Sequence, residues 1–414
     1  MANTLLRTFT NLFRPQKTAD GWWYRFYSSK SETYKQLDYL LAFEEIPEVN
    51  SVIGKLADFT SNGIFKVVNE KLEEQTEHPV NRLLKNPNWF QAQKEFIQQT
   101  TIFHAIYGNE YVFSLTPFGF NFSPDKVKAI YTLPPNLIKA KYKSDVPFFM
   151  HDKVPDALKY YYKKENGKYE EISASSIIHL NDNRVCIDKV NDEQMYQGSS
   201  RLKSLAPVIN NIRMAYESRG MILKSRGANG AWVPEAAKDV VGPIALTPNE
   251  HKDLQDQFKM NYGTLDGQSQ FIVSNRPMKF VQAGLNEPEK LGLYKETQEG
   301  FYKIIDSYGL HPDVFSNEKG ATFENQRQAE KGVYIRTVIP NSNEWAMAFN
   351  QKFLPDGKLK VIADYSHLPF FQEDLKLKAD ALNTIINALS RAFQDSAITI
   401  EEYKNELIKY GLMQ

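Results

Sequence analysis

Apolar residues recur at helical spacing in two segments of the N-terminal third of the chain. Residues 46–63 and 91–106 each turn one apolar face inward, and Gly63 and Gly108 are typical helix stops. The inward positions are Val49, Val52, Ile53, Leu56 and Phe59 in the first segment, and Phe96, Ile97, Thr100, Phe103 and Tyr107 in the second. A strand at 64–69 and a short helical turn at 79–84 are predicted between them.

The pattern changes over residues 110–190, which are rich in Tyr, Phe, Val and turn residues. This composition is typical of antiparallel β-structure. The predicted strands are 111–115, 129–133, 158–162 and 176–180. We therefore expect one α+β domain up to residue 190.

Two long helices are predicted at 200–226 and 288–309. The regular part of the first is expected to begin only at Pro207. Asn286 and Pro288 suit the start of the second. Its narrow apolar stripe comprises Leu291, Tyr294, Phe301, Ile305 and Tyr308.

Residues 227–285, between the two long helices, are predicted to form a small α/β module. Gly and Pro punctuate this insert. A helix at 248–262, capped by Thr247, and strands at 271–273 and 278–281 are expected.

After the second long helix comes an irregular polar loop, 310–322, and then a helical pattern from 323 to 353. Pro340 lies inside that pattern, so we expect a kink there. A strand at 358–362 and helices at 372–392 and 400–410 complete the predicted fold. Thr399 is the expected cap of the last helix, and Gly411 its stop.

Composition excludes several classes of protein. The 414 residues carry 50 Lys+Arg and 50 Asp+Glu, which argues against a generally basic nucleic-acid coat and a polybasic membrane binder. The single cysteine, Cys186, excludes an internal disulfide framework and favours a reducing compartment. No signal peptide and no run of about 18 apolar residues is found, so no membrane span is expected.

We find no catalytic constellation, and we predict neither enzyme activity, cofactor nor metal site. Phosphate-binding glycine loops, the serine elbow and zinc-type histidine spacings are absent from the sequence. Cys186 lies beside a β pattern and is interpreted as an inert thiol. His311, before Pro312, is interpreted as part of a structural turn.

Four stretches follow one another in a characteristic order between residues 46 and 355. They are HPVNRLL at 78–84 with NPN at 86–88 and GNEY at 108–111; IIHL at 177–180 with GSSRL at 198–202; YGLHP at 308–312; and FEN at 323–325 with TVIP at 337–340. In order and spacing they resemble the portal (head-to-tail connector) proteins of tailed bacteriophages, in the compact siphophage-like branch. Arg201 stands where the family usually has proline.

The resemblance implies an α+β portal-type protomer with the following parts. These are an N-terminal arm (1–35), a mixed α/β wing (36–199), a first stem helix (200–226), a small α/β clip (227–287), a second stem helix (288–309), a channel loop (310–322), a kinked helix returning to the wing (323–371) and a helical crown (372–414).

The resemblance also implies a function. Copies of the chain would form a ring, usually of twelve, at one capsid vertex, through which double-stranded DNA is packaged and ejected. The expected partners are the chain itself, DNA passing without sequence recognition, the terminase large subunit, the major capsid protein or scaffold, and a head-completion or adaptor protein. The expected location is the virion, after assembly in the host bacterial cytoplasm and without a membrane.

Two sets of residues follow as hypotheses. The loop residues Asn317, Glu318, Lys319, Gly320 and Thr322 are expected to face DNA in the channel. The stem residues Arg213, Arg219, Lys224, Glu296, Glu299 and Lys303 are expected at contacts between subunits. Residues 200–226 carry six basic side chains and one acidic one, which would match the acidic second helix of a neighbour, although such a charge run also suits a solvated face.

Two alternatives remain open on the sequence. One is a monomeric α+β hydrolase or carbohydrate-binding protein, with the Tyr and Phe residues of 110–165 lining a sugar cleft. The other is a virion scaffold or adaptor without a channel. A closed ring with an open axis would separate the portal from both.

Overall fold

The computed structural model describes most of the chain. The described residues are 36–117, 122–142, 158–182, 187–190, 193–224, 230–234, 249, 252, 278–282, 292–315, 322–395, 397 and 399–409. The expected N-terminal arm, Cys186, most of the insert and the caps Thr247 and Asn286 lie outside them. The chain divides into two compact units: Met1–Glu45, Lys66–Lys203 and Met347–Val361 form unit 1, and Ile46–Phe65, Ser204–Ala346 and Ile362–Gln414 form unit 2.

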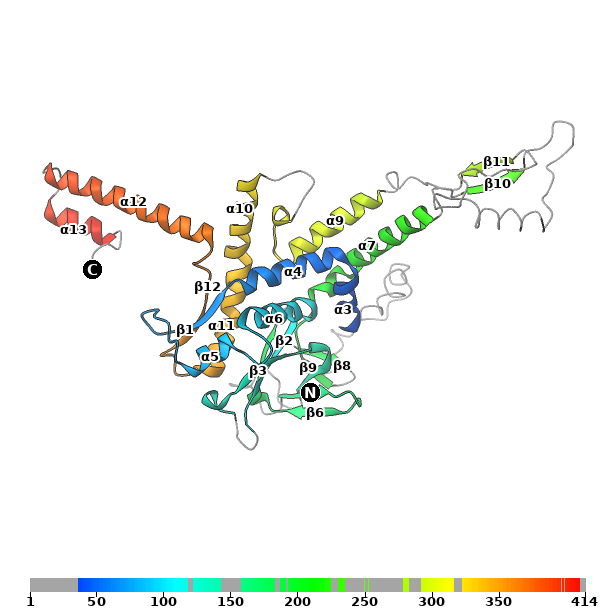
Figure 1. Cartoon of the computed structure of the whole chain (residues 1–414), viewed down its shortest axis with the longest axis horizontal. Helices are drawn as coiled ribbons and strands as arrows, with labels where there is room; N and C mark the ends of the chain where they lie inside the picture. Colours follow the sequence, from blue (N-terminus) through cyan, green and yellow to red (C-terminus); the bar gives the residue numbers. More distant parts are fainter. Residues whose placement is uncertain are drawn as a thin grey trace, which may run out of the picture. The chain divides into compact units, whose positions relative to one another are not determined.

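Unit 1 combines helices with antiparallel sheets, as the sequence predicts (Figure 1). Its helices are α3 (Gln36–Glu45), α5 (Pro79–Lys85) and α6 (Gln93–Tyr107). One sheet has the order β3-β2-β7, with β2 Asn109–Leu115, β3 Ala129–Leu133 and β7 Ile177–Asn181. The other has the order β6-β5-β4-β9-β8, with β4 Ile138–Tyr142, β5 Leu158–Lys163, β6 Tyr169–Ile172, β8 Ile187–Val190 and β9 Glu193–Tyr196.

One hydrophobic cluster joins these two sheets. Tyr111 of β2 and Ile177 of β7 pack with residues of β4 and β5. The other members are Ile138, Ala140, Leu158 and Tyr160. The richness of residues 110–190 in Tyr, Phe and Val predicted strands in this region, and some of these residues form the cluster.

The described elements of unit 2 are mostly helical. They are α4 (Pro47–Ser61), α7 (Arg201–Lys224, beginning at the end of unit 1), α9 (Leu293–Ser307), α10 (Phe323–Val333), α11 (Ile339–Phe353, continuing into unit 1), α12 (Pro369–Gln394) and α13 (Ile400–Lys409). Strands β10 (Gly230–Pro234) and β11 (Met278–Gln282) pair antiparallel within the insert. Strands β1 (Ile64–Val68) and β12 (Lys360–Asp364), each of which has residues in both units, form a further two-stranded sheet.

A cluster of aromatic rings holds α4 against the segment that follows α10. Tyr334 is fully buried and contacts Phe59 of α4, Tyr365 and Phe370, with ring centroids 5.2 to 5.4 Å apart. The Tyr365 hydroxyl donates to the Thr60 carbonyl at 2.9 Å and pairs with the Ser342 hydroxyl at 2.7 Å. Burial raises the pKa of Tyr334 to about 12. The inward face predicted for α4 is confirmed, since all five of its apolar residues are buried.

Helices α7 and α9 run side by side, and a glycine sets their separation (Figure 1). A Cβ at Gly300 would lie 2.9 Å from the side chain of Ile212, so the helices meet where one of them has no side chain. Asn211 of α7 also donates to the Glu296 carboxylate of α9 at 2.9 Å. The buried face of α9 comprises Thr297, Gly300, Ile304 and Ile305, and Tyr308, directly after the helix, is also buried.

Three expectations about the long helices are corrected. Helix α7 is regular from Arg201, because the Ser200 hydroxyl accepts from Leu202 N–H at 3.1 Å and caps it there, before Pro207. Helix α9 begins at Leu293, since Gly292 has a left-handed φ of 64° that a continuous helix from 288 does not allow. Tyr294 is exposed, so it does not belong to a buried stripe.

The helix containing Pro340 loses α-geometry directly before the proline. Tyr334–Val338 is π-helical, and Ile339 N–H donates to the carbonyl of Tyr334, five residues back. Proline lacks an N–H and presses its ring on the carbonyl four residues earlier, and a wider turn relieves both problems. The sequence predicted a kink at Pro340, and the structure has a π-helical turn directly before it.

Two glycine substitutions test the packing of α7 on α9. Gly300→Ala should lower the melting temperature, because overpacking a tight helix contact costs about 1–3 kcal/mol. Gly220→Ala, on α7 where an added Cβ would meet nothing within 4 Å, should raise it, because alanine favours the helix by about 0.5–1 kcal/mol. Circular dichroism melts of both variants check this, and equal gains would show that the contact at Gly300 is loose.

Candidate functional site

The first of the four motifs, HPVNRLL at 78–84 with NPN at 86–88, has a structural role. His78 caps α5, its Nδ1 accepting from Val80 N–H at 3.3 Å. Asn81 is fully buried, and its side-chain oxygen accepts from Val67 N–H at 3.0 Å. Asn88 donates to the Ile130 carbonyl at 3.1 Å and thereby fastens the NPN turn to β3. In each of these contacts the side chain supports the fold of unit 1.

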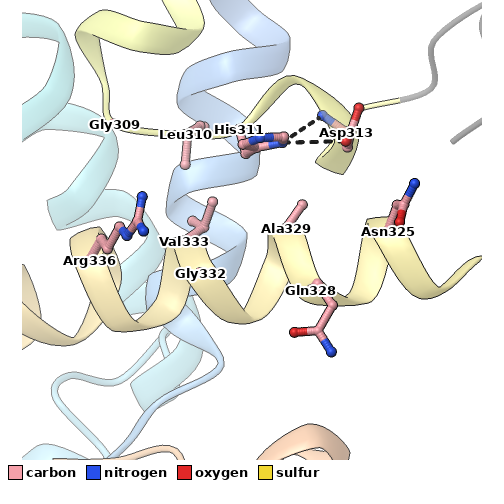
Figure 2. A pocket seen from close by; sticks show the side chains of 10 residues that line it. All are labelled: Gly309, Leu310, His311, Asp313, Asn325, Gln328, Ala329, Gly332, Val333 and Arg336. Carbon is pink, nitrogen blue, oxygen red and sulfur yellow. Dashed lines mark hydrogen bonds and ion pairs between the residues drawn. The ribbon is translucent and has the colours of Figure 1, made fainter.

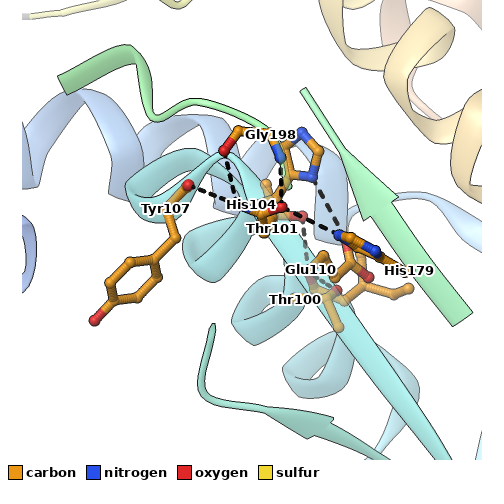
Figure 3. Close-up of polar contacts among 9 residues, drawn as sticks. Thr100, Thr101, His104, Tyr107, Glu110, His179 and Gly198 are labelled. Atoms are coloured by element: carbon orange, nitrogen blue, oxygen red, sulfur yellow. Dashed lines mark hydrogen bonds and ion pairs between the residues drawn. The ribbon is translucent and has the colours of Figure 1, made fainter. Parts of the chain in front are cut away.

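The second motif meets the GNEY stretch at the start of α7, and we call this contact the α7 anchor (Gly108, Asn109, Gly198 and Ser200). Figure 3 shows Gly198 of this anchor with His104 and His179 beside it. The Asn109 side chain accepts from Gly198 N–H at 2.7 Å and donates to the Gly198 carbonyl at 3.0 Å. Ser200 donates its hydroxyl to the Ile106 carbonyl at 2.5 Å. The first turn of α7 is thus bonded to the end of α6.

Only glycine fits at both glycine positions of the α7 anchor, because the backbone of the facing segment lies too close for a side chain. A Cβ at Gly108, which has a φ of 66°, would lie 2.5 Å from the Ser199 carbonyl oxygen, and a Cβ at Gly198 would overlap the Gly108 carbonyl. Arg201 donates from Nε to the Asp182 carboxylate at 2.7 Å. This ion pair ties the first residue of α7 to the segment just after β7.

Two histidines beside the anchor are held neutral. Asn109 donates its amide to two carbonyls, so its oxygen faces His179 Nε2 at 3.1 Å and that nitrogen must carry the proton. His179 Nδ1 then accepts from the Tyr160 hydroxyl at 3.3 Å. Burial lowers the pKa of His179 to about 3. It also lowers the pKa of His104, 3.9 Å from the buried Glu110, to about 4.

The third and fourth motifs also meet each other, and they border a pocket of about 380 Å³ (Figure 2). The Thr337 hydroxyl donates to the Gly309 carbonyl at 2.6 Å, and Gly309 has a φ of 68°. His311 turns back and accepts from Asp313 N–H at 3.2 Å, as the structural interpretation predicts. We call this cavity the loop pocket; it is lined by Gly309, Leu310, His311, Asp313, Asn325, Gln328, Ala329, Gly332, Val333 and Arg336.

The predicted channel-loop residues are placed only in part. Asn317, Glu318, Lys319 and Gly320 lie outside the described residues. Thr322 is the N-cap of α10, where its hydroxyl accepts from Asn325 N–H at 3.3 Å. The loop pocket therefore lies beside both ends of the predicted loop.

The predicted stem residues lie on the α7–α9 pair. Arg213 contacts Glu217 at 3.5 Å, and Lys295 contacts Glu299 at 3.5 Å, each one turn away on the same helix. Lys303 is exposed, and the side chain of Lys224 is outside the description. The structure thus pairs these charges along each helix, with Asn211 and Glu296 as a link between helices.

Arg219 has a different environment, which the sequence did not reveal. Its guanidinium lies 4.5 Å from the centroid of the Tyr216 ring, with Nε and Nη2 buried and without a hydrogen-bond partner among the described residues. The Tyr216 hydroxyl donates to Glu48 of α4 at 2.6 Å. Glu48 lies far from Tyr216 in sequence, so no local pattern could have joined them.

No metal-type cluster is found within the described residues, where His, Cys, Asp and Glu never gather in threes suited to an ion. Over the same residues, no helix has the length and apolar character that crossing a membrane requires.

Comparison with known proteins decides the family. The family model "Phage portal protein" matches residues 47–407, most of the chain. The chain belongs to the phage portal protein family. This family is structural rather than catalytic.

Similar proteins extend over nearly the same length. An uncharacterized protein of Rickettsia bellii (strain RML369-C) is 21% identical over 330 residues, covering 76% of this chain and 78% of the relative. A chain in the virion structure of a native gene transfer agent (GTA) particle has a TM-score of 0.57 at 16% identity, with 92% of this chain and 94% of that chain covered. A chain from the neck of a native GTA particle, computed with C12 symmetry, has a TM-score of 0.55 at 16% identity. The match covers 90% of this chain and 92% of that chain. These structures share the portal fold with this chain.

Acid should destabilise the protein through the histidines beside the α7 anchor. In the unfolded chain each histidine binds a proton near pH 6.5. In the folded chain the lowered pKa values keep His104 and His179 neutral until the pH falls to about 4 and about 3. Stability is therefore full above pH 6.5 and is lost as the pH falls from 6.5 towards 4, by up to about 1.4 kcal/mol per pH unit for each histidine.

His179→Gln isolates this effect, because glutamine keeps one donor and one acceptor but does not titrate. Urea unfolding between pH 7 and 4.5 should show a shallower loss of stability in this variant than in the native chain. Parallel curves for the two proteins would show that His179 already binds its proton in the folded state.

Proposed function

We propose that copies of this chain form a closed ring, of about twelve, that serves as the portal at one capsid vertex. The observation that supports this most is the match of the portal family and fold over nearly the whole chain. A similar chain belongs to a neck with C12 symmetry, and another to a virion particle. The paired helices α7 and α9, on either side of an insert, are the elements that a stem and clip require.

The axis of this ring would carry double-stranded DNA. A channel that neutralised many phosphates would hold DNA tightly, because each neutralised phosphate adds salt-dependent affinity. The zero net charge of the chain instead suits a polar wall that lets DNA slide. Asn317, Glu318, Lys319, Gly320 and Thr322 would supply that wall at the loop, without reading bases.

The other partners follow from the same assignment. The insert of 227–287 would receive the terminase large subunit during packaging and a head-completion or adaptor protein afterwards. The wing would contact the major capsid protein or scaffold. Assembly would take place in the host bacterial cytoplasm, and the finished ring would remain in the virion.

Native mass spectrometry and electron microscopy of the purified protein test the ring directly. We expect particles near twelve times the 47.7 kDa chain, with a central hole. A compact monomer at every concentration tried would contradict the proposal and would favour one of the non-channel alternatives.

The stem charges give a second test. In the ring, the basic helix α7, with Arg213 and Lys224, would face the acidic α9 of the next copy (Glu296 and Glu299, beside Lys303). Arg219 would join that contact only after leaving Tyr216, because two of its guanidinium nitrogens are buried in the single chain. Arg213 is exposed, and within the described part of the chain its guanidinium pairs with a residue of its own helix, so it can also bind a neighbour.

Arg213→Glu should therefore lower the fraction of rings at a given protein concentration, and raising the salt concentration to about 0.5 M should lower it in the native chain. Lys163→Glu, the same charge change at an exposed position of β5, is the matched control and should assemble normally. Normal rings from both variants would place Arg213 outside the contact.

A further inference from the structure

Helix α10 is barely covered in the single chain. Residues 322–326 and 328 are exposed, and Val333 is the buried residue of the helix. Short helices gain most of their stability from packing one face against a neighbour. The first turn of α10 is therefore largely uncovered, and the helix is held from Arg327 onward by the ion pairs Arg327–Glu373 and Lys331–Asp374 with α12.

The loop pocket lies on one side of α10. Asn325, Ala329, Gly332 and Arg336 line it at spacings of three or four residues, which places them on one face of the helix. Leu310 and Val333 are buried and give it apolar walls, and a Cβ at Gly332 would meet nothing within 4 Å. His311 and Arg336 supply polar groups beside these walls (Figure 2).

An exposed aromatic side chain, that of Phe323, lies on the opposite side of the same helix. At about 100° per residue, Phe323 is turned roughly 120–180° away from Ala329 and Gly332. Its side chain is 80% exposed although it is the first residue of a helix capped by Thr322. An exposed phenylalanine on a rigid helix start is a ready anchor for another protein surface.

The loop pocket on one face of α10 and the projecting Phe323 ring on the opposite face suit a head-to-tail assembly of copies. In such an assembly each copy presents one surface to the copy before it and a different surface to the copy after it. The charges agree, because acidic Glu324 follows Phe323, and Arg336 at the pocket forms no ion pair with a described residue.

We propose that Phe323 of one copy inserts its ring into the loop pocket of the next copy, with Glu324 beside Arg336 of that neighbour. The occupant of the pocket is thus a second copy of this chain. Arg336 would lie at the inserted ring, where a guanidinium cation stacks favourably on an aromatic face. The inference rests on the proposed ring and adds the contact that closes it beside the channel loop.

Disulfide trapping tests the contact. Phe323→Cys and Ala329→Cys are combined with Cys186→Ser, which removes the one native cysteine. The two new cysteines are six residues apart on one helix, about 9 Å along its axis, so they cannot bond within a chain. Mild oxidation should give a ladder of cross-linked multimers on a non-reducing gel.

The control pair is Phe323→Cys with Glu330→Cys, on the same helix but outside the pocket. It should give no ladder. If both pairs cross-link equally, or if intact rings form and neither pair cross-links, the contact is wrong while the ring stands. If the native chain itself forms no ring, the proposed function fails first, and native mass spectrometry distinguishes the two results.

Charge exchange gives a second measurement that does not depend on cysteine chemistry. Glu324→Arg and Arg336→Glu should each raise the protein concentration needed for ring formation, and the double variant should restore it. Phe323→Ala should raise that concentration at least about tenfold, as expected for an anchor residue, and Phe323→Leu should restore part of it. Because all three side chains are exposed in the single chain, the melting temperatures of these variants should stay near that of the native chain. Unchanged ring formation in Glu324→Arg, Arg336→Glu and Phe323→Ala would overturn the inference.

Discussion

The structure of unit 1 depends on one close approach between two backbone segments. Gly108 and Gly198 lie about ninety positions apart in sequence. A Cβ at Gly108 would clash with the Ser199 backbone, and a Cβ at Gly198 would clash with the Gly108 carbonyl. Asn109 then bonds both the N–H and the carbonyl of Gly198 with a single side chain. This pairing satisfies two buried backbone groups, which would each cost about 1–3 kcal/mol if left alone. It fixes where α7 begins, and it keeps His179 in one tautomer.

The same principle recurs at the loop pocket in unit 2. Gly309 turns with a positive φ, and its carbonyl accepts from Thr337, at the point where the π-helical segment approaches Pro340. In both places a glycine from one motif packs on a polar side chain or backbone from the next. The spacing of the four motifs is therefore explained by contact: they meet in pairs, and each pair sets the start or end of a long helix.

The sequence predicted the local elements well and the contacts between them poorly. Periodicity located α4 and α6 because each has one buried face, and the Tyr, Phe and Val composition of 110–190 located the strands around Tyr111. It misplaced the start of α9, since the left-handed φ of Gly292 leaves no periodic signal. It also overlooked Glu48 with Tyr216, and Asn109 with Gly198, because these partners are joined only by the tertiary fold. The count of charges predicted the same role for Arg213 and Arg219, but Arg213 is exposed whereas Arg219 stacks on Tyr216.

The position of α10 has a consequence for assembly. The helix is joined through Tyr334 to an aromatic cluster, and Arg327 and Lys331 pair with Glu373 and Asp374 of α12. Phe323 and the loop pocket are thus carried by elements of unit 2 alone. A ring closed through them would have its geometry set by unit 2, and differences in unit 1 could change the capsid contacts without changing the number of copies. Subunit number and capsid partner would then be free to vary separately.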